Sequence, residues 1–193
     1  MNQSLEPTAG RIAKIYEDRQ KPLWWVKTAN GLMLSAKLSW DALDPLLWHN
    51  PTKFGPLREV VAYWNSFLLL TAFAFENLYR AILVARGGNW RDVRKGKNSH
   101  ALVKQLSSVT TLTDEEISLV RRLETYLLWA GRYTVPWKLQ TYVDDSREFR
   151  ESIQGSDLNT AEGLYRRLLS LVQSEATAEG SAALQQSKGA EKG

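Results

Sequence analysis

A long apolar stretch from Leu57 to Arg86 constrains this chain more than any other part of its sequence. It contains no proline, and it is followed by Gly87 and Gly88, small residues of the kind that commonly end an α-helix. Its apolar side chains cover most of the helical circumference, which is typical of a helix with neighbours on several sides. The sequence therefore predicts a central, buried helix around which the rest of the fold is built.

The same stretch must be weighed as a membrane span. Its most apolar run, residues 60–75, is interrupted by Asn65, Ser66 and Thr71 and is shorter than the roughly 20 residues that a span needs. The first ten residues have neither the basic start nor the apolar run of a secretory signal. The chain also has no cysteine, which fits a reducing compartment. We therefore expect a cytoplasmic protein without a membrane partner.

Further segments have helical patterns or helix-start signals. They run from about 27 to 40, 99 to 106, 114 to 130, 146 to 154 and 160 to 175. The clearest start is a capping box, in which Thr113 and Glu116 satisfy each other's free backbone amides at the beginning of a helix. The prediction is an all-α fold, a single bundle of four to six helices with a disordered C-terminal tail.

The two ends of the chain differ in composition from its middle. Residues 1–22 are polar and contain prolines, so we expect a flexible N-terminal segment. Residues 23–174 form the helical domain. Residues 175–193 consist mainly of Ala, Gly, Ser, Gln, Glu and Lys, which bury too little apolar surface to offset the entropy of ordering, so we expect a disordered tail.

The densest group of basic residues follows the central helix, in a chain whose net charge is +4. Cations interleaved with an aromatic ring and glycines can hold phosphates and stack a base, as proteins that bind single strands do. A solvated loop accounts for the same charges. Under the first interpretation the RNA-binding residues are Arg86, Trp90, Arg91, Lys95 and Lys97.

Polar groups within the apolar helix also require partners. Glu76 can form an ion pair with Arg80 one turn later or reach Arg132 across the core, or it can serve as a general base. Two histidines cannot form a multi-histidine metal site, and the carboxylates lack metal-ligand spacing, so we expect no metal. Glycine-rich phosphate loops, nucleophile elbows and dinucleotide fingerprints are missing from the sequence, and we expect no cofactor.

Three segments occur in an order that resembles the HEPN superfamily of small helical bundles. They are Phe75–Val84, Ser99–Leu106 and Leu123–Trp137. The second resembles the His-x-Leu-x-x-x-Leu start of a helix in that superfamily, and residues 129–136 are similar to its Arg-Tyr-Pro turn. The resemblance covers roughly residues 27–173.

The resemblance implies a bundle, often dimeric, whose active members cleave RNA without metal by means of an arginine and a histidine four to six residues later. Arg132 matches the arginine by helix context, but no histidine follows it; Arg94 has the expected spacing to His100. In this scheme Arg132 or Arg94 holds the phosphate and His100 transfers a proton, which suits its pKa near neutrality. The resemblance also implies a toxin or phage-defence setting.

A rival hypothesis is a non-catalytic helical module for protein interaction or dimerisation. In that case His100 is a structural residue, and the Arg-Tyr turn is a folding element. The expected partners are RNA under the first hypothesis and a second copy or a cognate protein under the second. The sequence leaves open whether the protein is an enzyme; if it is one, we expect a metal-independent endoribonuclease.

Overall fold

The computed structural model describes residues 9–49, 57–89, 101–127 and 154–190. Within these ranges the regular elements are all helical, and no strand is present. The elements are α1 (Ala9–Asp18), α2 (Pro22–Asp44), the π-helical turn η1 (Pro45–His49), α3 (Leu57–Ala85), α5 (Leu102–Ser107), α6 (Asp114–Thr125) and α8 (Asp157–Ala190). The prediction of an all-α helical bundle is confirmed.

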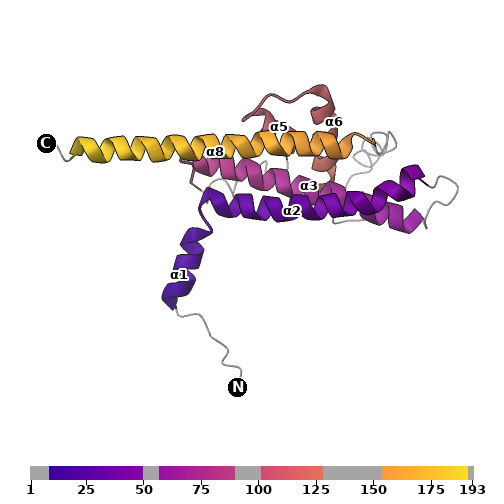
Figure 1. Ribbon diagram of the computed structural model, residues 1–193, viewed down its shortest axis with the longest axis horizontal. Helices are drawn as coiled ribbons and strands as arrows, with labels where there is room; N and C mark the ends of the chain where they lie inside the picture. The colour runs from indigo at the N-terminus through magenta and orange to yellow at the C-terminus, as the bar shows by residue number, and fades with distance from the viewer. Residues whose placement is uncertain (1–8, 50–56, 90–100, 128–153, 191–193) are drawn as a thin grey trace, which may run out of the picture.

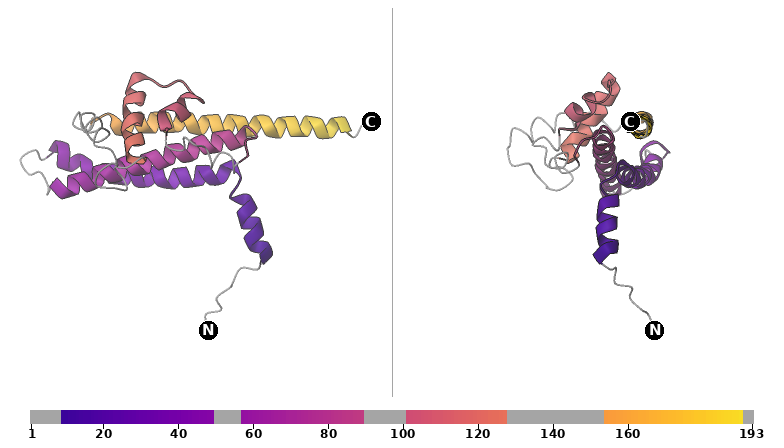
Figure 2. Two further views of the ribbon diagram at one scale, coloured as in Figure 1. Left: turned by 180° about the vertical axis from the view of Figure 1, so that it is seen from behind. Right: turned by 90° about the vertical axis from the view of Figure 1, so that its left-hand side faces the viewer.

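Helix α3 lies at the centre of the bundle and contacts α2, α5, α6 and α8 (Figure 1). Helix α2 runs antiparallel along one side of it, and α8 runs along another (Figures 1 and 2). The end-on view in Figure 2 shows α5 and α6 on the side of α3 away from α2. Helix α1 projects from the bundle at the N-terminal end of α2.

The predicted central helix is confirmed to within a residue at its C-terminal end. Its side chains Phe67, Leu68, Phe75, Leu78 and Ile82 are fully buried. Gly87 has a φ of 79°, which a residue without Cβ adopts at little cost. The Gly88 amide donates to the Leu83 carbonyl (2.9 Å) and the Gly87 amide to the Val84 carbonyl (3.1 Å). These two hydrogen bonds form a Schellman motif, which ends α3.

An aromatic cluster joins α2 to α3. The ring centroids of Trp40 and Phe67 lie 4.8 Å apart, and Trp64 stacks on Phe67 at 5.8 Å. These separations fall in the range in which aromatic rings attract one another beyond the burial of their area. The cluster helps to fix the register of α2 against α3.

Helix α2 extends beyond the predicted range of 27–40 in both directions. Pro22 lies in its first turn, where a missing backbone N–H costs nothing. At the other end, Pro45 cannot donate an α-helical hydrogen bond, and the chain continues as the π-helical turn η1 rather than as α-helix. At Pro45 the chain therefore changes from α-helix to a π-helical turn and remains helical.

Both ends of the chain contain more helix than the sequence predicted. Helix α1 lies within the 1–22 segment that we expected to be flexible. Helix α8 begins at Asp157 and continues to Ala190, which corrects the expectation of disorder from residue 175. Alanine, glutamate, glutamine and lysine are good helix formers, so a helix already nucleated by packing extends through them at little cost. The helix predicted for 146–154 lies outside the described residues except at Gln154.

One stretch of the described chain, Glu59–Ala85, is long and apolar enough to cross a membrane by length and composition alone. It is longer than the run of 60–75 that we considered from the sequence. Packing inside the protein buries 56% of its most apolar window. The contacts of α3 with its four neighbouring helices are thus sufficient reason for its apolar composition.

Candidate functional site

Two of the predicted site residues, Glu76 and Arg86, lie in the described part of the chain, both on or next to α3. The others lie outside the described residues; they are Trp90, Arg91, Arg94, Lys95, Lys97, His100 and Arg132. The structure describes the helices on either side of these residues in the sequence, α3, α5 and α6.

Glu76 is buried, with 5% of its surface exposed, and forms one of the two ion pairs that the sequence allowed. Its Oε1 accepts a hydrogen bond from Nη2 of Arg80 at 2.5 Å. The Arg80 guanidinium in turn lies over the Trp25 ring, 5.5 Å from its centroid, and is attracted by the ring face. The Glu76 carboxylate thus helps to hold α3 against the start of α2.

An open pocket of about 290 Å³ lies beside this contact. It is lined by Arg19, Trp24, Trp25, Thr28 and Asn77, which come from the α1–α2 junction, from α2 and from α3. Asn77 donates from Nδ2 to the Phe73 carbonyl (2.7 Å), which leaves its Oδ1 as an acceptor. The pocket can stack a planar ring against an indole and meet an anion with Arg19.

Arg86 lies at the C-terminal end of α3 and contacts α8. Its Nε donates to Oε1 of Glu175 at 2.9 Å, and both side chains are about one-third exposed. Exposure of this order makes the ion pair weak. The contact also ties residue 175, where we expected the tail to begin, to the central helix.

The junction of α5 and α6 brings two distant parts of the chain together. Glu124, in the last turn of α6, accepts a hydrogen bond from the Val103 amide at 3.0 Å. Val103 lies in the first turn of α5, where Ala101 has no side chain able to cap the helix. A carboxylate from α6 thus serves as the cap that α5 lacks in its own sequence.

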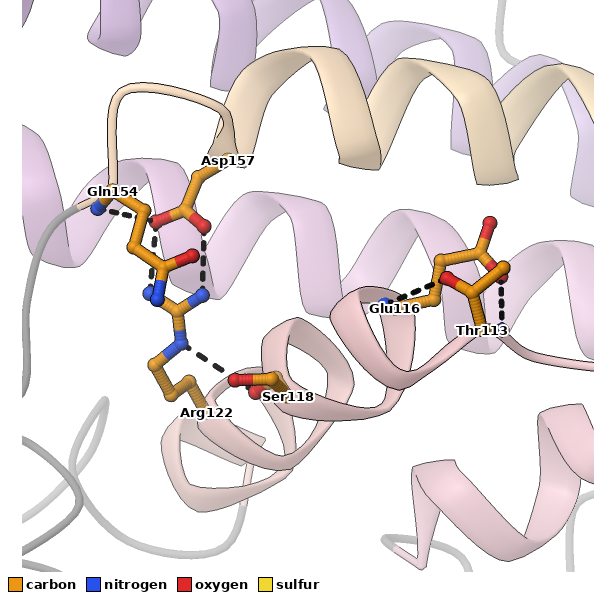
Figure 3. A network of polar contacts seen from close by, with 6 residues as sticks. All are labelled: Thr113, Glu116, Ser118, Arg122, Gln154 and Asp157. Atoms are coloured by element: carbon orange, nitrogen blue, oxygen red, sulfur yellow. Dashed lines mark hydrogen bonds and ion pairs between the residues drawn. The ribbon is translucent and has the colours of Figure 1, made fainter.

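Helix α6 is held against α8 by a buried ion pair at the N-terminus of α8 (Figure 3). Nη1 and Nη2 of Arg122 donate to the two carboxylate oxygens of Asp157 at 2.8 and 2.7 Å. Oδ2 of Asp157 also accepts a hydrogen bond from the backbone amide of Gln154 at 3.1 Å. Arg122 and Asp157 are 9% and 2% exposed, so the pair is desolvated and depends on this complete set of hydrogen bonds.

The predicted capping box at the start of α6 is present (Figure 3). The Glu116 amide donates to Oγ1 of Thr113 at 3.2 Å, and the Thr113 amide donates to Oε2 of Glu116 at 2.9 Å. The same Oε2 accepts from Nη2 of Arg167 on α8 at 2.7 Å. Burial favours the protonated form of Glu116, but the hydrogen bonds from Arg167 and Thr113 outweigh it and lower the pKa of this carboxyl.

Sequence reasoning missed the Arg122–Asp157 pair, although a signal for it existed. Arg122 falls between Leu119 and Leu123 on the buried side of α6, where a cation requires an acidic partner. The described residues contain no group of three or more His, Asp or Glu side chains that could hold a metal ion.

Comparisons of this chain with protein-family models, with curated proteins and with solved structures found no significant match.

Proposed function

We propose that this protein acts on single-stranded RNA in the manner of the HEPN superfamily, holding the strand near the α5–α6 junction and cleaving it without metal through His100. The order of three sequence segments supports the superfamily resemblance, and the all-α bundle is the fold that it requires. A toxin or phage-defence role is the setting that the resemblance brings with it. Binding of RNA without cleavage is the weaker form of the same proposal.

The observation that carries the proposal is the hydrogen bond between Glu124 and Val103. His100 lies three residues before Val103 in the sequence, and Arg132 lies eight residues after Glu124. The contact therefore joins the described residues next to both segments that bear the proposed catalytic groups. This hydrogen bond adds to the packing of α5 and α6 on each other and on α3.

A rigid platform supports this junction. The Arg122–Asp157 pair and the contact of Glu116 with Arg167 both fix α6 to α8, from the two ends of α6. Catalytic groups act best when the elements that carry them are locked by packing and by further hydrogen bonds. Helix α6 meets this requirement because both its first and its third turns are held by ion pairs.

The proposed reaction is attack by the RNA's own 2′-hydroxyl on the adjacent phosphorus. A bond forms between the 2′-oxygen and phosphorus, and the bond to the 5′-oxygen of the next nucleotide breaks. The proton of the 2′-hydroxyl passes to a base, and the departing 5′-oxygen takes up a proton from an acid. A histidine suits either transfer near neutral pH, and an arginine stabilises the charge on the phosphorane with a planar pair of donors.

Cleavage and retention of an end-labelled, mixed-sequence single-stranded RNA in EDTA test the proposal. His100→Ala and Arg132→Ala should lose cleavage, and Arg94→Ala shows which arginine holds the phosphate. His49→Ala is the matched control, because it removes the chain's other histidine. Cleavage that His100→Ala retains would contradict the assignment of His100. If the protein retains the RNA without cutting it, only the binding form of the proposal stands. If the protein neither retains nor cuts the RNA, the proposal is contradicted.

Glu124 acts as a positioning residue in this account, and Glu124→Ala tests that role separately. The variant removes the cap of α5 without removing a proposed catalytic group, so kcat should fall with little change in KM. Glu115→Ala is the control, since Glu115 is an exposed acid on the same helix. An unchanged kcat in Glu124→Ala would show that the junction does not position the catalytic groups.

A further inference from the structure

The open pocket of about 290 Å³ lies where the turn between α1 and α2 meets α3. Trp24, Trp25 and Thr28 line it from the start of α2, on which residues three and four apart are neighbours. Arg19 lines it from the turn and Asn77 from α3. We call it the tryptophan pocket. An apolar cavity of roughly 150 Å³ holds one benzene molecule, so this pocket has room for two fused rings.

Both tryptophans of the pocket have a cation over the indole ring. Nζ of Lys27 lies 4.8 Å from the Trp24 centroid, and the Arg80 guanidinium lies 5.5 Å from the Trp25 centroid. Trp25 also packs against the hydrophobic core. These contacts help to hold the two rings in place. Rings that are already held lose little conformational freedom when they stack on a flat ligand, so the pocket favours a planar aromatic compound.

Arg19 supplies a positive charge to the pocket. Its guanidinium forms no ion pair and no hydrogen bond within the described part of the chain. The acid next to it, Asp18, is instead paired with Lys21, whose Nζ lies 2.7 Å from Oδ1 of Asp18. The planar fork of an arginine matches the two oxygens of a carboxylate. Arg19 is therefore available for the carboxylate of a ligand.

Two further polar side chains of the pocket keep an oxygen that can accept a hydrogen bond. Nδ2 of Asn77 donates to the Phe73 carbonyl at 2.7 Å; because a carbonyl only accepts, this contact fixes which end of the amide is Oδ1. The Thr28 hydroxyl donates to the Trp24 carbonyl at 3.0 Å and retains its lone pairs. Both acceptors favour a ligand with an N–H donor.

We infer that the tryptophan pocket binds a small aromatic acid, a planar compound of two fused rings that carries a carboxylate and a ring N–H. The rings stack on the indoles, the carboxylate pairs with Arg19, and the N–H donates to Asn77 or Thr28. A nucleotide also offers a flat ring and an anion, but its ribose adds bulk beyond the two rings for which the pocket has room.

This inference goes beyond the proposed action on RNA and does not depend on it. The pocket lies at the start of α2, whereas α5 and α6 lie on the side of α3 away from α2 (Figure 2). A ligand in the tryptophan pocket therefore leaves the α5–α6 junction accessible. Failure of one proposal leaves the other standing.

Isothermal titration calorimetry of the full chain with indoleacetate, which has all three features of the ligand, is the first test. Binding should be saturable, with a dissociation constant in the micromolar to millimolar range expected of so small a compound. Indoleacetamide has the same shape without the charge and should bind about tenfold more weakly, because a charge-assisted hydrogen bond is lost. Naphthylacetate, which lacks the N–H, should also bind more weakly than indoleacetate.

Variants of the protein locate the binding site. Arg19→Ala should bind indoleacetate and indoleacetamide equally well, since the group that distinguishes them is gone. Arg11→Ala is the matched control, because Arg11 is an exposed arginine of α1 that does not line the pocket, and it should keep the wild-type preference. Trp24→Ala should weaken the binding of both compounds alike, because it removes a stacking surface without altering the charge.

Three results overturn the inference. The first is that indoleacetate shows no saturable binding to the wild-type protein. The second is that Arg19→Ala still prefers indoleacetate to indoleacetamide, which places the carboxylate elsewhere. The third is that adenosine monophosphate binds more tightly than indoleacetate and competes with it, which makes the pocket a nucleotide site rather than a site for an aromatic carboxylate.

Discussion

The guanidinium of Arg122 and the carboxylate of Asp157 face each other through two parallel hydrogen bonds of 2.8 and 2.7 Å, across 35 residues of sequence. The planar fork of arginine matches the geometry of a carboxylate, which makes such bidentate pairs specific as well as strong. Because the pair joins the third turn of α6 to the start of α8, it fixes the end of α6 from which the chain continues towards Arg132.

Removing one member of this pair should destabilise the protein by about 3–5 kcal/mol, because the remaining charge is left buried without a partner. Urea denaturation of Arg122→Ala and Asp157→Ala, followed by circular dichroism, measures this cost. The double variant Arg122→Met with Asp157→Leu should be more stable than either single variant. Arg166→Ala is the control, since its ion pair with Glu162 is long (3.9 Å) and exposed. Equal effects of Arg122→Ala and Arg166→Ala would contradict this account.

Glu116 should make stability depend on pH in the acid range. Its pKa is lowered in the folded protein from an ordinary value of 4.5, because its hydrogen bonds outweigh the opposing effect of burial. Its contribution is therefore present above pH 4.5 and is lost as the pH falls through the folded pKa. Glu116→Gln should show less loss of stability on acidification than the wild type. Thermal denaturation between pH 3 and about 7 checks this, and parallel curves for the two proteins would refute it.

Two buried tyrosines should make the protein sensitive to alkali. Burial raises the pKa of Tyr126 and of Tyr165 from 10.0 to about 12 each. The stability they contribute is fully present below pH 10 and is lost as the pH rises towards 12, because the unfolded chain ionises first. Absorbance of tyrosinate, followed during alkaline titration, should show that Tyr126→Phe and Tyr165→Phe each lose one late-ionising group relative to the wild type. An unchanged number of late-ionising groups in either variant would be inconsistent with this assignment.

Gly87 and Gly163 should respond in opposite directions to replacement by alanine. Gly87 has a left-handed φ of 79°, where a Cβ costs about 1–2 kcal/mol. Gly163 lies within α8, and an added Cβ there would meet nothing within 4 Å. Gly163→Ala should therefore stabilise the protein by about 0.5–1 kcal/mol through helix propensity. Thermal melting of both variants measures the two effects, and a stabilising Gly87→Ala would be incompatible with the Schellman end of α3.

The features that sequence reasoning predicted are local ones. The end of α3 at Gly87, the Thr113–Glu116 capping box and the Glu76–Arg80 pair each involve residues within a few positions of one another. Their geometry follows from the helix itself, since residues three and four apart are neighbours on its surface. The sequence alone therefore contains nearly all the information that these features require.

The contacts that define the α5–α6 junction are of a different kind. Glu124 caps a helix that begins 22 positions earlier in the chain, and Arg122 meets Asp157, 35 residues away, because α6 packs on α8. Which residues form these long-range contacts is determined by how the helices pack, and it cannot be read from the composition of the sequence. The helicity of residues 9–18 and 175–190 was missed for a related reason, because their polar composition resembles that of disordered segments while their helix propensity is high.

The most direct test of the proposed function compares a single-stranded RNA with the same oligonucleotide made of 2′-deoxyribose, both end-labelled and incubated with the protein in EDTA. The account predicts that the RNA is cut to products ending in a 2′,3′-cyclic phosphate, while the deoxy strand, which lacks the attacking hydroxyl, remains intact. If the RNA is neither retained nor cut, or if both strands are cut alike, the protein does not act on RNA in the way proposed here.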